Sequence, residues 1–290
     1  MMPPTLPANL VVLNTRPARQ QAQLTAAIEQ AGGRVVSLPM IEIEALEDAE
    51  AVARIRSQIN ELERFDMLIF VSANAAEIGV GWIEQFWPGL LNELPQRLPK
   101  ELTIIGVGPA TGAVLQERLG VPVVSAADST GSEAVLQLPA LFQVSGQRVA
   151  IIRGCGGREL LADTLRERGA EVEYIEVYRR TPCRYPPAEV ANRIKQEGVN
   201  AIVITSAESL ISFKAALTGD ADVVDVGNAS GGTITNSPAN IGAASLIPLV
   251  VPSARIADQA GKAGFRRVIS ADGSDPQSLL AALATLSASA

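Results

Sequence analysis

Short turns rich in glycine, hydroxyl side chains and arginine recur along the sequence, and their residue types suit the binding of an anion. Each turn follows a short apolar run and precedes a helix-like stretch. Hydroxyl groups cap helices, glycines let a ligand approach backbone N–H groups, and arginines add positive charge. The turns are Thr15-Arg16-Pro17, Ser72-Ala73-Asn74, Gly108-Pro109-Ala110-Thr111, Arg153-Gly154-Cys155-Gly156-Gly157, Thr205-Ser206-Ala207 and Pro252-Ser253-Ala254-Arg255.

Each turn also has a purely structural interpretation. Ser72, Thr111, Thr205 and Ser206 can be simple helix caps, each stabilising its helix by about 1 kcal/mol. The glycines of the turn after Arg153 can serve only close packing of a strand against a helix. For any one of these residues alone the structural role is the simpler hypothesis, whereas the set as a whole favours a ligand.

The segment from Gly106 to Gly112 has a spacing similar to a dinucleotide-binding fingerprint. It lies in the middle of a domain, and no P-loop lysine pattern occurs in the sequence. We therefore do not expect a nucleotide there.

The tyrosines form the other candidate group for chemistry, since all three lie within a short stretch of the chain. Polar and apolar residues alternate from Glu171 to Arg180, which predicts an exposed strand. We expect Tyr174, Glu176 and Tyr178 on one face of it, and Ile175 and Val177 on the other. Because tyrosine favours strands by propensity alone, the cluster by itself is only a weak indication of a site. The three are Tyr174, Tyr178 and Tyr185.

Composition narrows the chemistry further, because the sequence contains no histidine. Ser-His and Cys-His nucleophiles and most zinc sites are thereby excluded. Catalysis must use tyrosine, carboxylates, lysine, arginine, hydroxyl groups or backbone amides. The two cysteines, Cys155 and Cys183, lack the spacing of a metal site or a disulfide framework, so we expect reduced thiols.

Charge and hydropathy argue against nucleic acid and membrane as partners. The net charge is −7, whereas phosphate binding needs clustered lysine and arginine. The apolar runs are too short to cross a bilayer. Residues 1–9 show no basic segment followed by an apolar one, so we expect no secretory signal and a cytoplasmic location.

The turns are positioned by strands and helices that alternate along the chain. This order of elements predicts parallel sheets flanked by helices. A buried strand is expected from Leu10 to Asn14 and a helix from about Pro17 to Gly32-Gly33. In open parallel sheets, ligands bind beyond the carboxyl ends of the strands, which is where the turns fall. With 290 residues and 47% hydrophobic content, the chain suits two domains.

Internal similarity indicates that this architecture is duplicated. Similarity between βα units in general is the alternative explanation, but three blocks recur in the same order. The extra length of the second copy falls between Leu217 and Ile247, where a stretch rich in Gly, Ser and Asn predicts a surface loop, with a lid as the alternative. Arg16, Leu24, Ile28, Gly32 and Val35 keep their spacing in Arg153, Leu161, Leu165, Gly169 and Val172, residues 70–76 match 204–210, and residues 107–136 match 251–280.

Taken in order, these motifs resemble the uroporphyrinogen-III synthases, over roughly residues 10 to 280. The resemblance implies two α/β lobes, each a parallel sheet flanked by helices, joined by a two-stranded antiparallel linker. The implied lobes are residues 1–38 with 180–290, and residues 44–174, with linker strands at 39–43 and 175–179. The motifs are Thr15-Arg16-Pro17, Phe70-Val71-Ser72 with Asn74, Gly106 to Thr111, Arg153-Gly154 with Gly156-Gly157-Arg158-Glu159-Leu160, Val177 to Arg180, and Ile204-Thr205-Ser206.

The resemblance also implies a reaction. The family cyclises hydroxymethylbilane to uroporphyrinogen III, with loss of water and inversion of the last pyrrole ring, and uses no metal or organic cofactor. We expect a monomer that can receive its substrate from hydroxymethylbilane synthase. The alternatives are a noncatalytic two-lobed relative that binds or regulates and, from another class, a glycosyltransferase-like enzyme, which would need a nucleotide-sugar site.

Residue roles follow from the same resemblance. Tyr178 matches the tyrosine that assists departure of the substrate hydroxyl, and a phenol can donate a hydrogen bond to that oxygen. The turn Pro252-Ser253-Ala254-Arg255 departs from the Gly-Pro-x-Thr form of its counterpart at Gly108, which leaves its contacts open. The implied substrate-binding residues are Arg16, Ser72, Asn74, Gly108, Thr111, Arg153, Gly154, Gly156, Gly157, Thr205, Ser206, Ser253 and Arg255.

Overall fold

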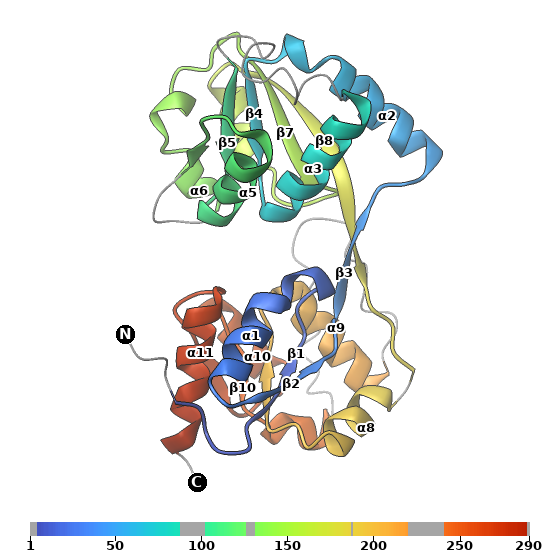
Figure 1. The fold of residues 1–290 in the computed structure, drawn as a ribbon, viewed down its shortest axis with the longest axis vertical. Helices are drawn as coiled ribbons and strands as arrows, with labels where there is room; N and C mark the ends of the chain where they lie inside the picture. Colours follow the sequence, from blue (N-terminus) through green and yellow to red (C-terminus); the bar gives the residue numbers. More distant parts are fainter. Residues whose placement is uncertain (1–4, 88–101, 126–130, 187, 220–240, 289–290) are drawn as a thin grey trace. The chain divides into compact units, whose positions relative to one another are not determined.

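A computed structural model describes residues 5–87, 102–125, 131–186, 188–219 and 241–288. The chain forms two compact units, and each is described here by itself. Unit 1 is made of Met1–Glu42 and Thr181–Ala290, and unit 2 of Ile43–Arg180. Figure 1 shows the strands of each unit side by side, with helices packed around them.

The sheet of unit 1 has the order β11-β10-β9-β1-β2, and all its neighbouring strands are parallel. Val12 of β1 lies opposite Val35 of β2 on one side and Ala201 of β9 on the other. The strands are short and apolar because helices cover both faces of the sheet. They are β1 (Val11–Asn14), β2 (Arg34–Ser37), β9 (Ala201–Val203), β10 (Leu249–Val251) and β11 (Val268–Ser270).

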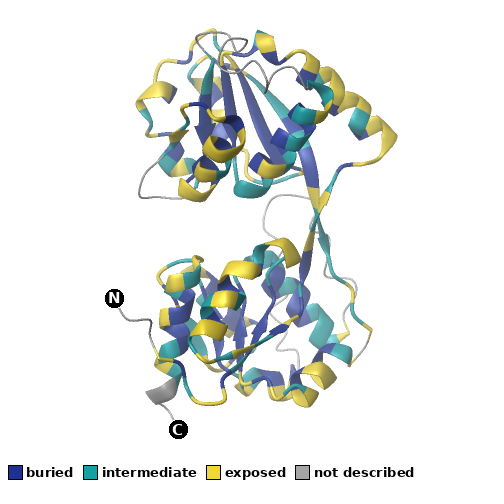
Figure 2. Ribbon diagram, in the orientation of Figure 1, coloured by how far each residue is buried: buried dark blue, intermediate teal, exposed yellow. Residues whose placement is uncertain are grey.

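Two apolar clusters, one on each face, hold the helices of unit 1 to this sheet. Leu24 and Ile28 of α1 pack with Leu279 of α11 against Val12. On the other face, Phe213 of α9 and Phe265 pack with Ile202. Figure 2 shows the buried strands and the exposed outer sides of the helices. The helices are α1 (Ala22–Gln30), α8 (Glu189–Gln196), α9 (Ala207–Thr218), α10 (Ala254–Lys262) and α11 (Pro276–Ala284), with 3₁₀ turns η1 (Ala18–Gln20), η5 (Gly242–Leu246) and η6 (Thr285–Ala288).

The second sheet has the order β3-β8-β7-β4-β5-β6, and the strands from β8 to β6 are parallel. Phe70, Ile104 and Ile152 contribute to the core on one face of the sheet, and Ile69, Ile105 and Ile151 to the core on the other. The strands are β3 (Ile41–Ala45), β4 (Met67–Phe70), β5 (Thr103–Gly106), β6 (Val124–Ser125), β7 (Arg148–Gly154) and β8 (Glu171–Pro182).

Two helices of unit 2, α3 and α5, begin shortly after the strands they follow. Ser72 ends the turn after β4 and caps α3, and Gly108 with Pro109 begins α5 after β5. The helices are α2 (Ala49–Asn60), α3 (Ala73–Phe86), α5 (Pro109–Leu119), α6 (Ser132–Val135) and α7 (Leu160–Glu167), with 3₁₀ turns η2 (Leu62–Arg64) and η3 (Pro139–Leu141).

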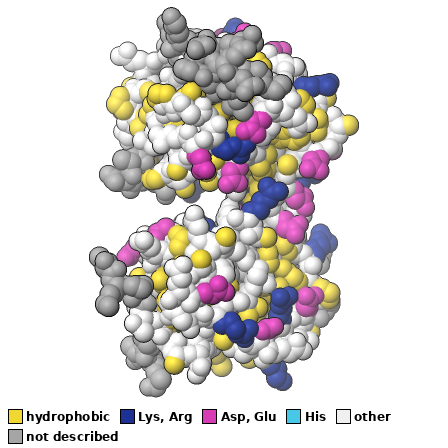
Figure 3. Space-filling view, viewed as in Figure 1, with side chains coloured by type: hydrophobic (Ala, Val, Ile, Leu, Met, Phe, Trp, Pro, Cys, Tyr) yellow, Lys and Arg dark blue, Asp and Glu magenta, His cyan; other side chains and the backbone are white. Residues whose placement is uncertain are grey.

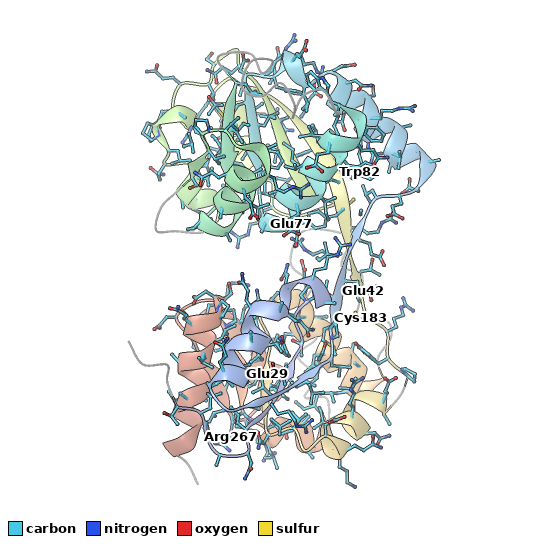
Figure 4. The ribbon with its side chains drawn as sticks, in the orientation of Figure 1. Glu29, Glu42, Glu77, Trp82, Cys183 and Arg267 are labelled. Carbon is cyan, nitrogen blue, oxygen red and sulfur yellow. The ribbon has the colours of Figure 1, made fainter. Side chains whose placement is uncertain are left out.

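Strands β3 and β8 contain the residues at which the chain passes from one unit to the other. Cys183 N–H donates to the Met40 carbonyl (3.0 Å), and Leu46 N–H to the Val177 carbonyl (3.1 Å). Partner numbers that rise on one strand and fall on the other identify an antiparallel pair. Figure 4 labels Glu42 and Cys183 on this pair.

The fold class predicted from the sequence is confirmed, since each unit is a parallel sheet flanked by helices. The predicted internal similarity also has a counterpart in the topology. If β1 and β2 correspond to β7 and β8, and β9, β10 and β11 to β4, β5 and β6, both sheets have the same strand order, with β3 added to one edge. Residues 220–240 of the Gly/Ser/Asn-rich stretch lie outside the described residues.

The predicted alternation along β8 is wrong at Tyr178. The register with β7 shifts between Arg153 and Gly154, so that Arg153 lies opposite Glu176 and Gly154 opposite Tyr178. A β-bulge of this kind adds one residue to a strand and re-aims the side chains beyond it. Tyr178 therefore shares a core cluster with Ile175 and Val177, and is fully buried.

Within the described parts of the chain, no helix combines the length and the apolar character needed to cross a membrane.

Candidate functional site

The structure divides the predicted site residues into two groups, one at the carboxyl edge of each sheet. Because all these strands are parallel within their own sheets, the turns that follow them meet at one edge of each unit. The unit 2 group is Ser72, Asn74, Gly108, Thr111, Arg153, Gly154, Gly156, Gly157 and Tyr178. The unit 1 group is Arg16, Thr205, Ser206, Ser253 and Arg255.

Tyr178 is the centre of the unit 2 group. Its hydroxyl lies 3.3 Å from Ser72 Oγ, and either oxygen can be the donor. Arg180 Nη2 donates to the same hydroxyl at 3.3 Å, and the guanidinium carbon lies 5.6 Å from the centre of the phenol ring. The phenol is therefore held between a helix-capping serine and a cation.

Gly154 makes room for this phenol. A Cβ atom at Gly154 would lie 2.5 Å from Cε2 and 2.6 Å from Cζ of Tyr178, closer than real Cβ contacts. The next residue fixes the strand, since Cys155 N–H donates to the Tyr178 carbonyl at 2.7 Å. Glycine at position 154 is thus required by the ring beside it.

The buried side chain of Arg153 forms hydrogen bonds with the glycine turn that follows it. It is 5% exposed, and its guanidinium donates to the carbonyls of Gly154 and Gly156 and to the Glu159 carboxylate. Gly156 and Gly157 have φ of 69° and 109°, backbone conformations that favour glycine. All three nitrogens of this guanidinium are used within the protein, so Arg153 stabilises the turn in this structure.

A tyrosine and a carboxylate complete the turn. The guanidinium carbon of Arg153 lies 4.4 Å from the ring centre of Tyr174, whose hydroxyl donates to Glu159. Burial, and next the hydrogen bond to Glu159, raise the pKa of Tyr174 to about 12. The hydrogen bond from Tyr174 lowers the pKa of Glu159 from its ordinary value. The carboxylate and the neutral phenol therefore stabilise each other.

The other hydroxyl groups of unit 2 have structural partners. Ser72 Oγ accepts the Ala75 N–H at 3.1 Å and caps α3. Thr111 is buried and donates to the Val107 carbonyl at 2.8 Å. Asn74 is half-buried in the first turn of α3, and Gly108, with φ of 84°, ends the turn before α5. The serine combines a cap with a contact to Tyr178, whereas the threonine bonds within its own turn.

In unit 1, Arg16 lies at the turn after β1. Its Nη1 reaches the Ser274 carbonyl at 3.5 Å, and its Nε is buried without a hydrogen-bond partner among the described residues. Burial lowers the pKa of this guanidinium from its ordinary value, and Asp275 opposes that effect. Thr15 beside it is buried and donates to the Val203 carbonyl at 2.7 Å, which ties the turn to β9.

The remaining unit 1 residues surround two helix starts. Ser206 Oγ accepts the Ser209 N–H at 3.0 Å and caps α9, with Thr205 half-buried before it. Ser253 caps α10 through the Ile256 N–H at 3.5 Å, and Arg255 is exposed in the first turn of that helix.

At an anion-binding site on either unit, the positive charge would come from individual arginine side chains. On the face drawn in Figure 3, lysine and arginine side chains lie among aspartates and glutamates. Opposite charges interspersed in this way largely cancel at a distance.

Sequence reasoning missed the role of two side chains. Arg180 was part of a motif but was given no contact, although residues two apart on a strand share a face. Asp275 caps α11 beside Arg16, and hydrogen bonds from Ser278 lower its pKa. Its position before Pro276 was an available signal, because aspartate followed by proline often begins a helix.

Fold and site together define a two-unit α/β protein with amide, hydroxyl and arginine groups along the carboxyl edge of each sheet. Comparisons with known proteins identify its family. A family model described as uroporphyrinogen-III synthase HemD matches residues 22–281. The uroporphyrinogen-III synthase of Proteus mirabilis is 35% identical over 65% of this chain and 89% of its own, and that of Escherichia coli is 31% identical over 69% and 76%.

Solved structures agree in fold. A mutant uroporphyrinogen III synthase from the extremely thermophilic bacterium Thermus thermophilus has a TM-score of 0.57 at 19% identity, covering 94% of this chain and 96% of its own. The enzyme from Helicobacter pylori 26695 has a TM-score of 0.51 at 13% identity, covering 96% and 99%. The chain belongs to the uroporphyrinogen-III synthase family, whose members act in tetrapyrrole biosynthesis.

Proposed function

We propose that this chain cyclises hydroxymethylbilane to uroporphyrinogen III, inverting the last pyrrole ring and releasing water. Family membership supports the reaction. The observation that carries the assignment of a catalytic group is the phenol of Tyr178, held at the carboxyl edge of a parallel sheet by Ser72 and Arg180. No metal or organic cofactor has a part in this proposal.

Tyr178 is the proposed catalytic residue. Its hydroxyl donates a hydrogen bond to the terminal hydroxyl of the substrate, which leaves as water and creates an electrophilic carbon. Because the phenol is buried, some of the side chains that now surround its hydroxyl must move before the substrate can reach it. The contact with Ser72 can remain, since Ser72 can donate its own hydrogen to the phenol oxygen and leave the phenol hydrogen for the substrate.

Ring closure must then occur at the substituted carbon of the last pyrrole, because closure at the free carbon gives the uninverted isomer. The main task of the protein is to hold a flexible chain in one conformation. We propose that the remaining predicted residues do this by binding the substrate carboxylates. Of the three predicted arginines, Arg16 and Arg255 are the better candidates, because the Arg153 guanidinium is already occupied.

The residue assignments of each unit belong to this proposal, as do three expectations about the whole protein. These are a monomeric state, action in the cytoplasm, and transfer of substrate from hydroxymethylbilane synthase. We also propose that residues 39–43 and 175–179 act as the linker between two lobes, residues 1–38 with 180–290 and residues 44–174. Sedimentation of the purified protein tests the monomer.

The decisive experiment mixes purified protein with freshly generated hydroxymethylbilane, oxidises the products and separates the isomers by chromatography. Predominantly type III product is the expected result. A type I to type III ratio equal to that of a protein-free blank would instead identify a noncatalytic relative. Binding of the substrate without conversion, followed by fluorescence, would then describe its role.

A further inference from the structure

Arg180 is held to Tyr178 by two contacts. Its Nη2 donates to the phenol oxygen at 3.3 Å, and its guanidinium carbon lies 5.6 Å from the ring centre. The two residues are two apart on β8 beyond the bulge, so their side chains project on the same face. Arg180 is half-buried, unlike the exposed Arg179 next to it.

The hydrogen bonds at the phenol oxygen limit what each group can do. Arginine only donates, so the phenol oxygen accepts in its bond with Arg180. Ser72 Oγ already accepts the Ala75 N–H, but its own hydrogen is available. When Ser72 also donates to the phenol, the phenol oxygen accepts two bonds and its hydrogen is left for another acceptor.

The charge of Arg180 matters as well as its direction. A cationic donor on a hydroxyl oxygen makes a stronger bond than a neutral one and polarises the O–H group, which strengthens that group as a donor. Burial of Tyr178 increases the effect, because water screens the contact less. A phenol in this position is prepared to donate to a departing oxygen.

We propose that Arg180 is a positioning residue for Tyr178, which it orients and polarises so that the phenol hydrogen points to the leaving hydroxyl of the substrate. This inference rests on the proposed function. In this proposal Arg180 acts through its contact with the phenol, so its contribution to catalysis depends on the Tyr178 hydroxyl. Arg179 has no such role, because its guanidinium is paired with the exposed carboxylate of Asp48 at 2.8 Å.

The test is a double-mutant cycle on the full chain. The variants are Arg180→Met, Tyr178→Phe and the pair together, with kcat and KM measured for hydroxymethylbilane consumption and the isomers resolved. Arg180→Met should lower kcat about tenfold with little change in KM, because it removes one charge-assisted hydrogen bond. In the Tyr178→Phe background the same substitution should change kcat less than about twofold, because no hydroxyl remains to be oriented.

Two further variants separate charge from folding. Arg180→Lys should recover most of the lost kcat, since lysine keeps the charge and a donor. Arg179→Met removes the same charge one residue away and should leave kcat and KM unchanged. Equal unfolding midpoints in the Arg180 variants and the unmodified chain would exclude a loss of fold.

Two outcomes contradict the inference. Equal losses of kcat in both backgrounds would give Arg180 a role independent of the phenol, and a rise in KM in both would make it a substrate contact. If the unmodified chain forms no type III product, the proposed function itself fails. That result is distinct from an active enzyme that is indifferent to Arg180.

Discussion

At Tyr178, one phenol combines three features: full burial, a cation on its oxygen and a glycine against its ring. A hydroxyl buried for packing alone would need only one partner. The second partner is a cation, and it favours a phenol that donates during reaction over one that only fills a core. Removing the hydroxyl tests this interpretation directly.

Tyr178→Phe should lower kcat by about a hundredfold and leave KM within about twofold, because general-acid assistance acts mainly on the transition state. The fold should survive, since the ring remains in its cavity. Steady-state kinetics with hydroxymethylbilane measure both constants. Tyr185→Phe is the matched control: it removes the hydroxyl of a half-buried tyrosine, which donates to the Pro39 carbonyl at 2.5 Å. Unchanged kcat in Tyr178→Phe, or an equal loss in both variants, would contradict the role of Tyr178.

Gly154→Ala should destabilise the protein by about 1–3 kcal/mol, because the new methyl group overlaps the Tyr178 ring. The same substitution at Gly81, within α3, meets no atom of the described residues within 4 Å and should stabilise by up to about 1 kcal/mol. Urea unfolding measures both. In a Tyr178→Ala background the Gly154→Ala penalty should largely vanish, and a penalty that persists would place its cause elsewhere.

Residue types allowed the turns to be predicted but not the direction of each side chain. Arg16, Arg153 and Arg255 looked equivalent in sequence, since each follows a strand. In the structure Arg153 is bound by its own turn, Arg16 is partly buried near Asp275, and Arg255 is exposed. Such differences depend on long-range neighbours, which a single sequence does not specify.

At the scale of the elements, a residue at the start of a helix can have a structural role as a cap or a functional role as a ligand contact. Ser206 is such a residue. Ser206→Ala should cost about 1 kcal/mol through loss of the α9 cap. Ser206→Asp should restore that stability, since aspartate caps well and suits a helix N-terminus. If Ser206 contacts a substrate carboxylate, however, Ser206→Asp should raise KM about tenfold by repulsion, and Ser206→Asn should not. Identical KM values for the aspartate and asparagine variants would leave Ser206 only the cap.

The contact between Tyr174 of β8 and Glu159, the residue before α7, predicts that stability depends on pH in the alkaline range. The pKa of Tyr174 is raised to about 12 in the folded state, above about 10 in an unfolded chain. The stabilisation from its neutral phenol is therefore complete below pH ~10 and is lost as the pH rises toward 12. Because the pair is partly exposed, solvent screening keeps this contribution near ~1 kcal/mol.

Tyr174→Phe should accordingly be less stable than the unmodified chain by about 1 kcal/mol at pH ~8, and the difference should shrink between about pH 10 and 12. Urea midpoints at each pH measure it. All other groups are the same in both proteins, so their effects cancel in the difference. A difference that stays constant through this alkaline range would show that the Glu159 contact adds nothing.

The alternation of polar and apolar residues predicted the strands and their order along the chain. It failed at the β-bulge in β8. A bulge inserts one residue without a signature in the alternating pattern, so residues up to Val177 were placed on the right faces and Tyr178 was not. Gly154 on the neighbouring strand was the available signal, since a glycine in a strand often marks a bulge or a close approach.

At the scale of the whole molecule, the arrangement of the chain makes a prediction about folding. Unit 2 is one continuous segment, Ile43–Arg180, with its own cores on both faces of its sheet. Unit 1 is made of two segments: the first ends at Glu42 in β3, and the second begins at Thr181 in β8. The hydrogen bond from Cys183 to Met40 sets a register in which Glu42 lies opposite Thr181.

A two-residue hairpin turn closes a hydrogen-bonded antiparallel pair of this kind. Replacing residues 43–180 by Asn-Gly should therefore yield a unit 1 that folds alone, and residues 43–180 produced separately should also fold. Cooperative thermal unfolding, followed by circular dichroism, measures both. Neither unit should form type III product by itself, since the proposed carboxylate contacts are shared between the two groups of turns. Activity in isolated unit 2, which contains Tyr178, would show that the unit 1 turns are dispensable. If either unit failed to unfold cooperatively, the two cores would depend on each other.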